Sequence, residues 1–199
     1  MSFVSSVCVY CGSSNGSNGN YAAAARRFGN QLARAGLGLV YGGGTWGVMG
    51  AVAAGCLEGG GRVTGIIPRF IMKREAAEGA LDNISELIVT EDMHQRKHLM
   101  FGHSDAFVAL PGGIGTLEEI VEIMTWAQLG QHEKPIVFAN IDGFWNPLLA
   151  LIEHMKAQGF VHSEHRLRPI IVEEVDDIVP ALIDAGRVSE GDQAIIGRL

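Results

Sequence analysis

The sequence has 199 residues, of which 47% are hydrophobic and 19% are charged, and its formal net charge is −7. These values exclude a wholly disordered chain and predict one globular domain. The acidic charge makes nucleic acid a poor partner, and no apolar run is long enough for a membrane span. Because the first residues do not resemble a secretory signal, we expect a cytoplasmic protein whose three cysteines are free thiols.

Short apolar runs alternate with longer helical patterns along the chain. In chain order, the patterns predict a strand at 7–10, a helix at 21–35, a strand at 37–41, a helix at 48–57, a strand at 62–67, a surface excursion at 71–85, a strand at 87–90, a helix at 93–104, a strand at 106–110, a helix at 117–129, a strand at 136–139, a helix at 147–158, a strand at 169–172 and a helix at 175–184. This alternation predicts right-handed βαβ units and an α/β fold with a parallel sheet. We expect residues 1–185 to form the domain and residues 186–199 to form a polar tail.

Three loops that follow strands are rich in glycine or serine: 11–14, 41–47 and 110–116. Parallel α/β sheets bind their ligands beyond the carboxyl ends of the strands. The three loops are therefore the candidate ligand-binding segments.

The loop at 42–47 satisfies the pattern G-x-G-x-x-G between a strand and a helix, as in dinucleotide-binding proteins. An NAD site also needs an acidic residue at the end of the next strand, and that strand ends in Pro68 and Arg69. NAD is therefore disfavoured. Binding of another phosphate remains open, and so does a tight turn that serves only close helix packing.

The loop at 111–116 follows the most uniformly apolar strand. Its residues Gly112, Gly113 and Gly115 can expose successive amides, and Thr116 adds a hydroxyl. The Gly-Lys-Ser/Thr sequence of a triphosphate-binding loop is missing, so a monophosphate fits better than a triphosphate. We predict that this loop binds the phosphate of a nucleotide.

Two carboxylates, Glu118 and Glu119, follow this loop. Thr116 and Glu119 have the spacing of a helix capping box, which is a purely structural interpretation. The functional alternative places a carboxylate beside the sugar of a bound nucleotide, where it stabilises an oxocarbenium-like transition state or activates water. The spacing alone leaves both interpretations open.

A basic cluster, His94, Arg96 and Lys97, opens a predicted helix. Cations at a helix N-terminus oppose the helix dipole, and a bound anion would remove that conflict. A solvated helix face is the alternative. The spacing of His94 and His98 imitates a zinc protease helix, but Gln95 replaces the required general base, so no metal is expected.

Cys8 and Cys11 have the C-x-x-C spacing of a redox pair or a metal clip. Residues three apart on a strand point to opposite faces, so core packing is the favoured interpretation.

The stretch Pro111-Gly112-Gly113-x-Gly115-Thr116-x-x-Glu119, preceded by Met93-His94-x-Arg96-Lys97, resembles the Lonely Guy (LOG) family. Its members are cytokinin riboside 5′-monophosphate phosphoribohydrolases, and many relatives carry the label lysine decarboxylase. The segments 11–14, 41–44 and 125–130 match the family as well, and the resemblance extends from about Val7 to Ile183. It implies a Rossmann-like, doubly wound parallel sheet flanked by helices, and a homodimer with its active site near the subunit interface.

The resemblance also implies a reaction: hydrolysis of the N-glycosidic bond of AMP or an N6-modified AMP, without a metal or redox cofactor. The implied catalytic residues are Arg96 and Glu119. The implied phosphate- and substrate-binding residues are Gly112, Gly113, Gly115, Thr116, Glu118, Lys97, Thr125, Gly43, Gly44, Ser13 and Glu75, with Glu78 as the alternative to Glu75. A non-catalytic nucleotide or cofactor carrier on the same fold is the competing hypothesis. A pyridoxal phosphate decarboxylase is disfavoured, because none of the few lysines lies beside a recognisable cofactor site.

Overall fold

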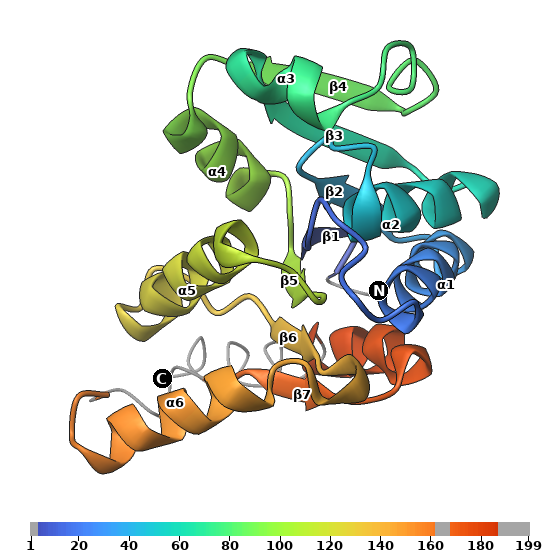
Figure 1. Cartoon of the computed structure of the whole chain (residues 1–199). Helices are drawn as coiled ribbons and strands as arrows, with labels where there is room; N and C mark the ends of the chain where they lie inside the picture. Colours follow the sequence, from blue (N-terminus) through green and yellow to red (C-terminus); the bar gives the residue numbers. More distant parts are fainter. Residues whose placement is uncertain (1–3, 162–167, 187–199) are drawn as a thin grey trace, which may run out of the picture.

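A computed structural model describes residues 4–161 and 168–186, which form one parallel sheet flanked by helices (Figure 1). The strands pair in the order β4-β3-β2-β1-β5-β6-β7. Their bounds are β1 Ser6–Tyr10, β2 Gly38–Tyr41, β3 Val63–Pro68, β4 Glu86–Thr90, β5 Ala106–Ala109, β6 Ile136–Ala139 and β7 Ile170–Val172. The helices are α1 Asn20–Arg34, α2 Gly47–Glu58, α3 Arg69–Glu75, α4 Met93–Gly102, α5 Ile114–Gln128 and α6 Asn146–Ala157. The doubly wound α/β fold predicted from the sequence is confirmed.

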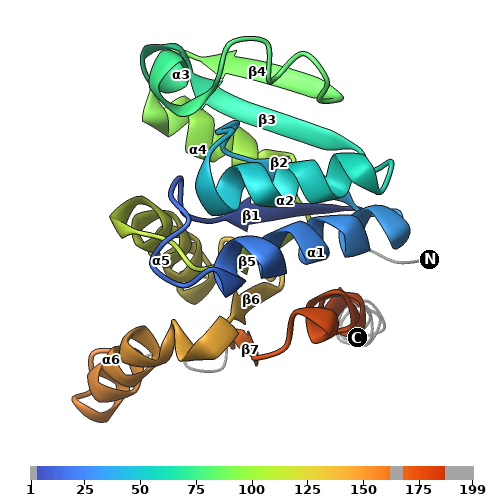
Figure 2. The same cartoon turned by 45° about the vertical axis from the view of Figure 1, so that its right-hand side comes forward.

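Two hydrophobic cores lie on the two faces of the sheet. Val7 and Val9 of β1 pack with α1 and α2, whereas Cys8 and Tyr10 point to the opposite face and pack with α4 and α5. Figures 1 and 2 show the same division of helices between the faces. The two-residue alternation along buried strands produces this arrangement. Cys11 joins the core beside α1 and α2, so the C-x-x-C cysteines are core residues, as predicted.

The strand order reverses between β1 and β5. From β1 the chain builds outward through β2, β3 and β4, and it then returns to place β5 on the other side of β1. Val9 pairs with Tyr41 of β2, and Tyr10 pairs with Ala109 of β5, so these three strands end at the same edge. The three glycine-containing loops therefore leave the sheet side by side at its switch point, where doubly wound folds bind ligands.

Three boundaries differ from the sequence predictions. The segment 71–85 was expected to be irregular, yet its beginning belongs to the short helix α3, which carries Glu75. α5 starts at Ile114 rather than 117, because extended Gly113 already serves as its N-cap. The last helix spans 178–186 after a 3-10 turn at Val175–Asp177. Of the predicted tail, residues 187–199 lie outside the described residues.

Among the helices of the described segments, none has the length and hydrophobicity that crossing a membrane requires.

Candidate nucleotide-binding active site

Backbone contacts join the three glycine-containing loops into one unit. The amide of Gly12 donates to the carbonyl oxygen of Pro111 at 3.1 Å, and the amide of Met49 donates to the carbonyl oxygen of Gly12 at 3.0 Å. Gly47, at φ +63°, approaches the backbone of Ser14 so closely that a Cβ atom would collide with it. A Cβ atom at Gly12 would be in tight contact with Gly112 at 3.2 Å, so the glycines at 12 and 47 both serve the close approach of the loops.

The loop after β5 offers an open backbone surface at the start of α5. A Cβ atom on Gly112 would collide with the side chain of Thr116 and lie 2.8 Å from the amide of Gly12. In contrast, Cβ atoms on Gly113 and Gly115 would meet nothing within 4 Å. The first turn of α5 contains no acidic residue and no side chain caps it. Its first N–H groups, which have no acceptor within the helix, are therefore available to an anion.

The capping-box interpretation of Thr116 and Glu119 is wrong. Gly113 is the N-cap, so Thr116 stands inside the first turn and Glu119 stands in the second. Neither side chain makes a capping hydrogen bond. Since Glu119 does not stabilise the end of α5, its burial requires another explanation.

Glu119 is a buried carboxylate, 9% exposed, on the face of α5 that packs toward the sheet. Burial raises its pKa to about 7; attraction by Arg96 opposes that rise, and repulsion by Glu118 and Glu75 adds to it. A carboxyl group that titrates near neutrality can take up and release a proton at physiological pH.

Arg96 places a buried guanidinium opposite Glu119. α4 begins with Asp92 as a side-chain N-cap that accepts a hydrogen bond from the amide of Gln95 at 2.8 Å. Arg96, one turn later, is 4% exposed, and its Nη2 donates to the carbonyl oxygen of Gly42 at 3.1 Å. Its buried Nε has no hydrogen-bond partner within the described chain. Buried donors are normally paired, so this Nε is available to a further hydrogen-bond acceptor.

Glu75, rather than Glu78, contacts the loop that follows β2. The carbonyl oxygen of Glu75 accepts a hydrogen bond from the amide of Thr45 at 2.8 Å and lies 3.5 Å from the Cβ position of Gly44. Its carboxylate Oε2 is buried and has no partner among the described residues, whereas Glu78 is exposed. Gly43 adopts a φ of +74° at the end of β2, which lets this loop turn toward α3.

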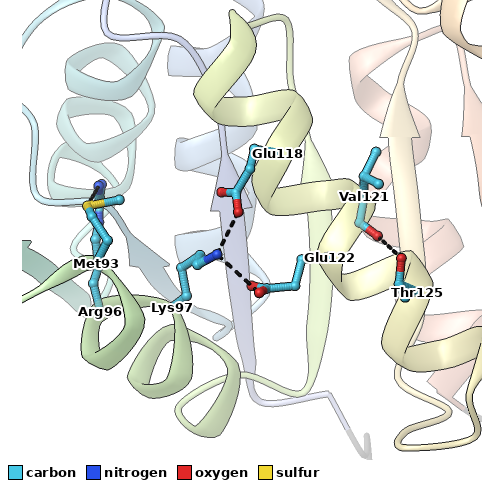
Figure 3. A network of polar contacts seen from close by, with 7 residues as sticks. All are labelled: Met93, Arg96, Lys97, Glu118, Val121, Glu122 and Thr125. Carbon is cyan, nitrogen blue, oxygen red and sulfur yellow. Dashed lines mark hydrogen bonds and ion pairs between the residues drawn. The ribbon is translucent and has the colours of Figure 1, made fainter.

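Lys97 links α4 to α5 (Figure 3). Its Nζ donates to Glu118 at 2.6 Å and to Glu122 at 3.1 Å. Burial disfavours the ammonium, but the two hydrogen bonds outweigh that effect and raise the pKa of Lys97. Glu122 is not among the site residues predicted from the sequence. Its spacing of four residues from Glu118, on one face of a helix, was the available signal.

Two predicted site residues lie apart from this cluster. Ser13 is exposed on the loop after β1. Thr125 is exposed two turns beyond Glu118 on α5, and its hydroxyl donates to the carbonyl oxygen of Val121 at 2.8 Å (Figure 3). Arg96 and Glu75 both act electrostatically on Glu119, whereas these two hydroxyls are exposed.

A polar cavity of about 650 Å³ lies elsewhere, between α1 and the loop after β6. Two pairs of its polar side chains bond to each other: Asn20 donates to Asp142 at 3.0 Å, and Asn140 donates to Asn146 at 2.8 Å. None of the predicted site residues lines it.

Comparison with known proteins identifies the family. A family model described as "Possible lysine decarboxylase" matches residues 49–182. Cytokinin riboside 5′-monophosphate phosphoribohydrolase LOG4 of Arabidopsis thaliana is 47% identical over 160 residues, which cover 80% of this chain and 73% of that protein. The chain belongs to the LOG family. LOG1 of Arabidopsis thaliana is 42% identical over 178 residues, which cover 89% of this chain and 82% of its own length.

Solved structures outside the plant LOG proteins share the fold. A molybdenum cofactor carrier protein from Chlamydomonas reinhardtii superposes with a TM-score of 0.67 at 21% identity, over 90% of this chain and 96% of its own. The molybdenum cofactor binding protein from Rippkaea orientalis gives 0.63 at 21% identity, over 89% and 93%. At this identity the likeness concerns the Rossmann-like architecture alone, which is the fold that the LOG resemblance implied.

The lysines of the chain do not fit the older family label. A pyridoxal phosphate decarboxylase needs a lysine free to form a Schiff base. Lys97 is held by two carboxylates, and Lys134 donates to the carbonyl oxygen of Phe101 while it lies 3.9 Å from that ring's centroid. Lys156 pairs with Glu153 on the surface of α6, and Lys73 is exposed on the surface of α3. Lys97, the lysine that lies between α4 and α5, is therefore held by carboxylates and is not free to form a Schiff base.

Proposed function

We propose that this protein hydrolyses the N-glycosidic bond of a nucleoside 5′-monophosphate, either AMP or an N6-modified AMP, and releases the free base and ribose 5-phosphate. The observation that carries the proposal is the pair of buried, oppositely charged side chains, Arg96 and Glu119, beside the open loop at 112–116. The names of the LOG relatives support the same substrate class.

The phosphate is assigned to the start of α5. The unoccupied space beside Gly113 and Gly115 lets the phosphate oxygens approach the backbone amides, and the positive end of the helix dipole favours their charge. Because Glu119 follows Gly115 by one turn on the same helix, a nucleotide held here by its phosphate has its ribose within reach of that carboxylate.

Hydrolysis builds positive charge on the ribose as the C1′–N9 bond breaks. The ionised form of Glu119 stabilises that charge and takes a proton from the water whose oxygen bonds to C1′. The base leaves with the electrons of the broken bond, and the proton that Glu119 took from water is passed on to a nitrogen of the base through solvent, which returns Glu119 to its ionised form. The ribose hydroxyls are held by two side chains: Arg96, whose Nε is free to donate, and Glu75, whose Oε2 is free to accept. These contacts orient the ribose so that C1′ lies beside the Glu119 carboxylate.

The decisive experiment is a substrate panel scored by released base. Wild-type protein is expected to produce free base and ribose 5-phosphate from AMP or isopentenyl-AMP. Glu119→Gln is expected to bind AMP without turning it over. If wild type leaves the whole panel intact but is stabilised by the nucleotides, the protein is a carrier and the proposal is wrong.

We further infer a cytoplasmic homodimer. The exposed face of α5 carries Ile114, Val121 and Leu129, which are 81%, 41% and 65% exposed. Apolar side chains repeated on one helix face are typical of a surface that a partner covers. Glu118 and Thr125 lie on the same face, so a second copy bound there would border the substrate site. The three buried free thiols suit a reducing compartment.

A further inference from the structure

α5 presents two carboxylates to one ammonium group. Glu118 and Glu122 are one helical turn apart and face Lys97 of α4 together (Figure 3). The Lys97 side chain is 11% exposed, whereas Glu122 is 28% and Glu118 is 53% exposed. The trio carries one positive and two negative charges, so Lys97 needs only one of the two carboxylates to stay paired.

The two carboxylates differ in their surroundings. Glu118 is the more exposed, follows the open loop residue Gly115 by three positions and precedes Glu119 directly. Glu122 lies one turn farther from the loop and is more buried. Of the two, only Glu118 lies where it can turn toward a ligand held at 112–116, and doing so requires it to release Lys97.

A buried ammonium that loses its partner destabilises the protein strongly. If Glu118 were its only partner, contact between Glu118 and a ligand would leave the buried ammonium of Lys97 without a counter-charge. Glu122 removes that penalty, because its bond to Nζ at 3.1 Å persists when Glu118 leaves.

We propose that Glu122 is a positioning residue, which keeps Lys97 paired and so frees Glu118 to accept a hydrogen bond from a ribose hydroxyl of the bound nucleotide. The substrate class in this proposal rests on the proposed function. The role of Glu122 itself follows from the shared ammonium and the unequal exposure of its two partners.

Glu122→Gln tests the proposal. The variant is expected to fold, since Glu118 still holds Lys97, but Glu118 is then no longer free for the ligand. KM for AMP is expected to rise about tenfold with kcat changed less than about threefold. Glu153→Gln is the matched control, because it removes a carboxylate from the surface ion pair with Lys156 and should change neither constant.

A mutant cycle separates this role from simple helix packing. In a Lys97→Met background, Glu122→Gln is expected to change the dissociation constant of AMP less than about twofold. The melting temperature of Glu122→Gln should stay close to that of wild type, while the double variant Glu118→Gln/Glu122→Gln should melt much lower. A tenfold effect that persists without Lys97, a single variant as unstable as the double one, or an unchanged KM would each overturn the proposal.

The dissociation constants are measured in a Glu119→Gln background, where turnover is absent. A wild-type protein that binds AMP without cleaving it therefore contradicts the proposed hydrolysis, and the binding cycle still decides the role of Glu122. Conversely, an active wild type whose AMP affinity is unaffected by Glu122→Gln contradicts only the positioning role.

Discussion

The guanidinium of Arg96 rests on the backbone of Gly42. Nη2 donates to the carbonyl oxygen of Gly42 at 3.1 Å, and the same nitrogen fills the space that a Cβ atom at position 42 would occupy. Gly42 opens a pattern that resembles a phosphate-binding fingerprint. In this fold its lack of a side chain serves an arginine 54 positions later in the chain.

Gly42→Ala is expected to displace Arg96 without unfolding the sheet, because the colliding atom is the end of a flexible side chain. We expect turnover of AMP to fall about 100-fold, the usual effect of a misplacement near 1 Å in an active site. Gly38→Ala on the same strand is the control, since its nearest neighbour would lie at 3.7 Å. Equal activity of the two variants would contradict the assigned role of Arg96.

The stability of the protein is expected to depend on the proton of Glu119. Its pKa of about 7 in the folded state exceeds the ordinary 4.5, so the folded state binds this proton more tightly than the unfolded state. That stabilisation is complete below about pH 4.5 and is lost as the pH rises to about 7.

Glutamine does not titrate, so Glu119→Gln should not lose stability as the pH rises. The variant should match wild type near pH 4.5 and exceed its free energy of unfolding by about 3 kcal/mol at about pH 8, measured by urea denaturation. Glu153→Gln, at a surface site, should show no such trend. A difference that stays constant with pH would mean that Glu119 does not titrate in this window.

Gly115→Ala separates phosphate binding from folding. The added methyl meets no atom within 4 Å and improves helix propensity by about 1 kcal/mol, so the melting temperature should not fall. It occupies the space assigned to the phosphate, and AMP affinity measured by calorimetry should weaken at least about tenfold. Gly102→Ala in α4, also without neighbours, should leave affinity unchanged. Unaltered affinity of Gly115→Ala would remove the phosphate from this loop.

Leu129→Glu tests the proposed homodimer. The side chain is 65% exposed at the C-cap of α5, and a charge there weakens association if a second copy covers it. We expect wild type to sediment as a dimer and the variant to shift toward monomer. Leu151→Glu on α6, where the leucine is 52% exposed, should not change the sedimentation. A wild-type monomer would contradict the proposal.

The sheet and the edge at which the three loops meet could be predicted because their signals are local. Runs such as 106–110 alternate with helical patterns, and the parallel topology then brings loops 11–14, 41–47 and 110–116 to one edge. The spacing of Thr116 and Glu119 left a capping box open as one interpretation, because spacing alone does not fix where a helix begins. In the structure Gly113, with an extended backbone, is the N-cap, so Thr116 already stands inside the helix.

Other parts of the site depend on tertiary contacts that local patterns do not encode. α3 contains no buried residue, so 69–75 lacks the periodic apolar face by which helices are predicted. The proposed role of Glu122 depends on its hydrogen bond with Lys97, which lies 25 positions earlier in the chain. Only the packing of α4 against α5 brings the two residues together. The preference for Glu75 over Glu78 likewise follows from the contact between Glu75 and Thr45.

The attachment of α3 has a consequence for binding. This helix is held near the site by hydrogen bonds from the amide of Thr45 to Glu75 and from the amide of Ala77 to the Thr45 hydroxyl. A segment with so little buried surface opens locally at a small free-energy cost while the sheet stays intact. Part of the nucleotide's binding free energy then offsets the cost of holding α3 against the loop. Bound nucleotide should therefore slow hydrogen exchange at the amides of Thr45 and Ala77 more than at amides of the sheet.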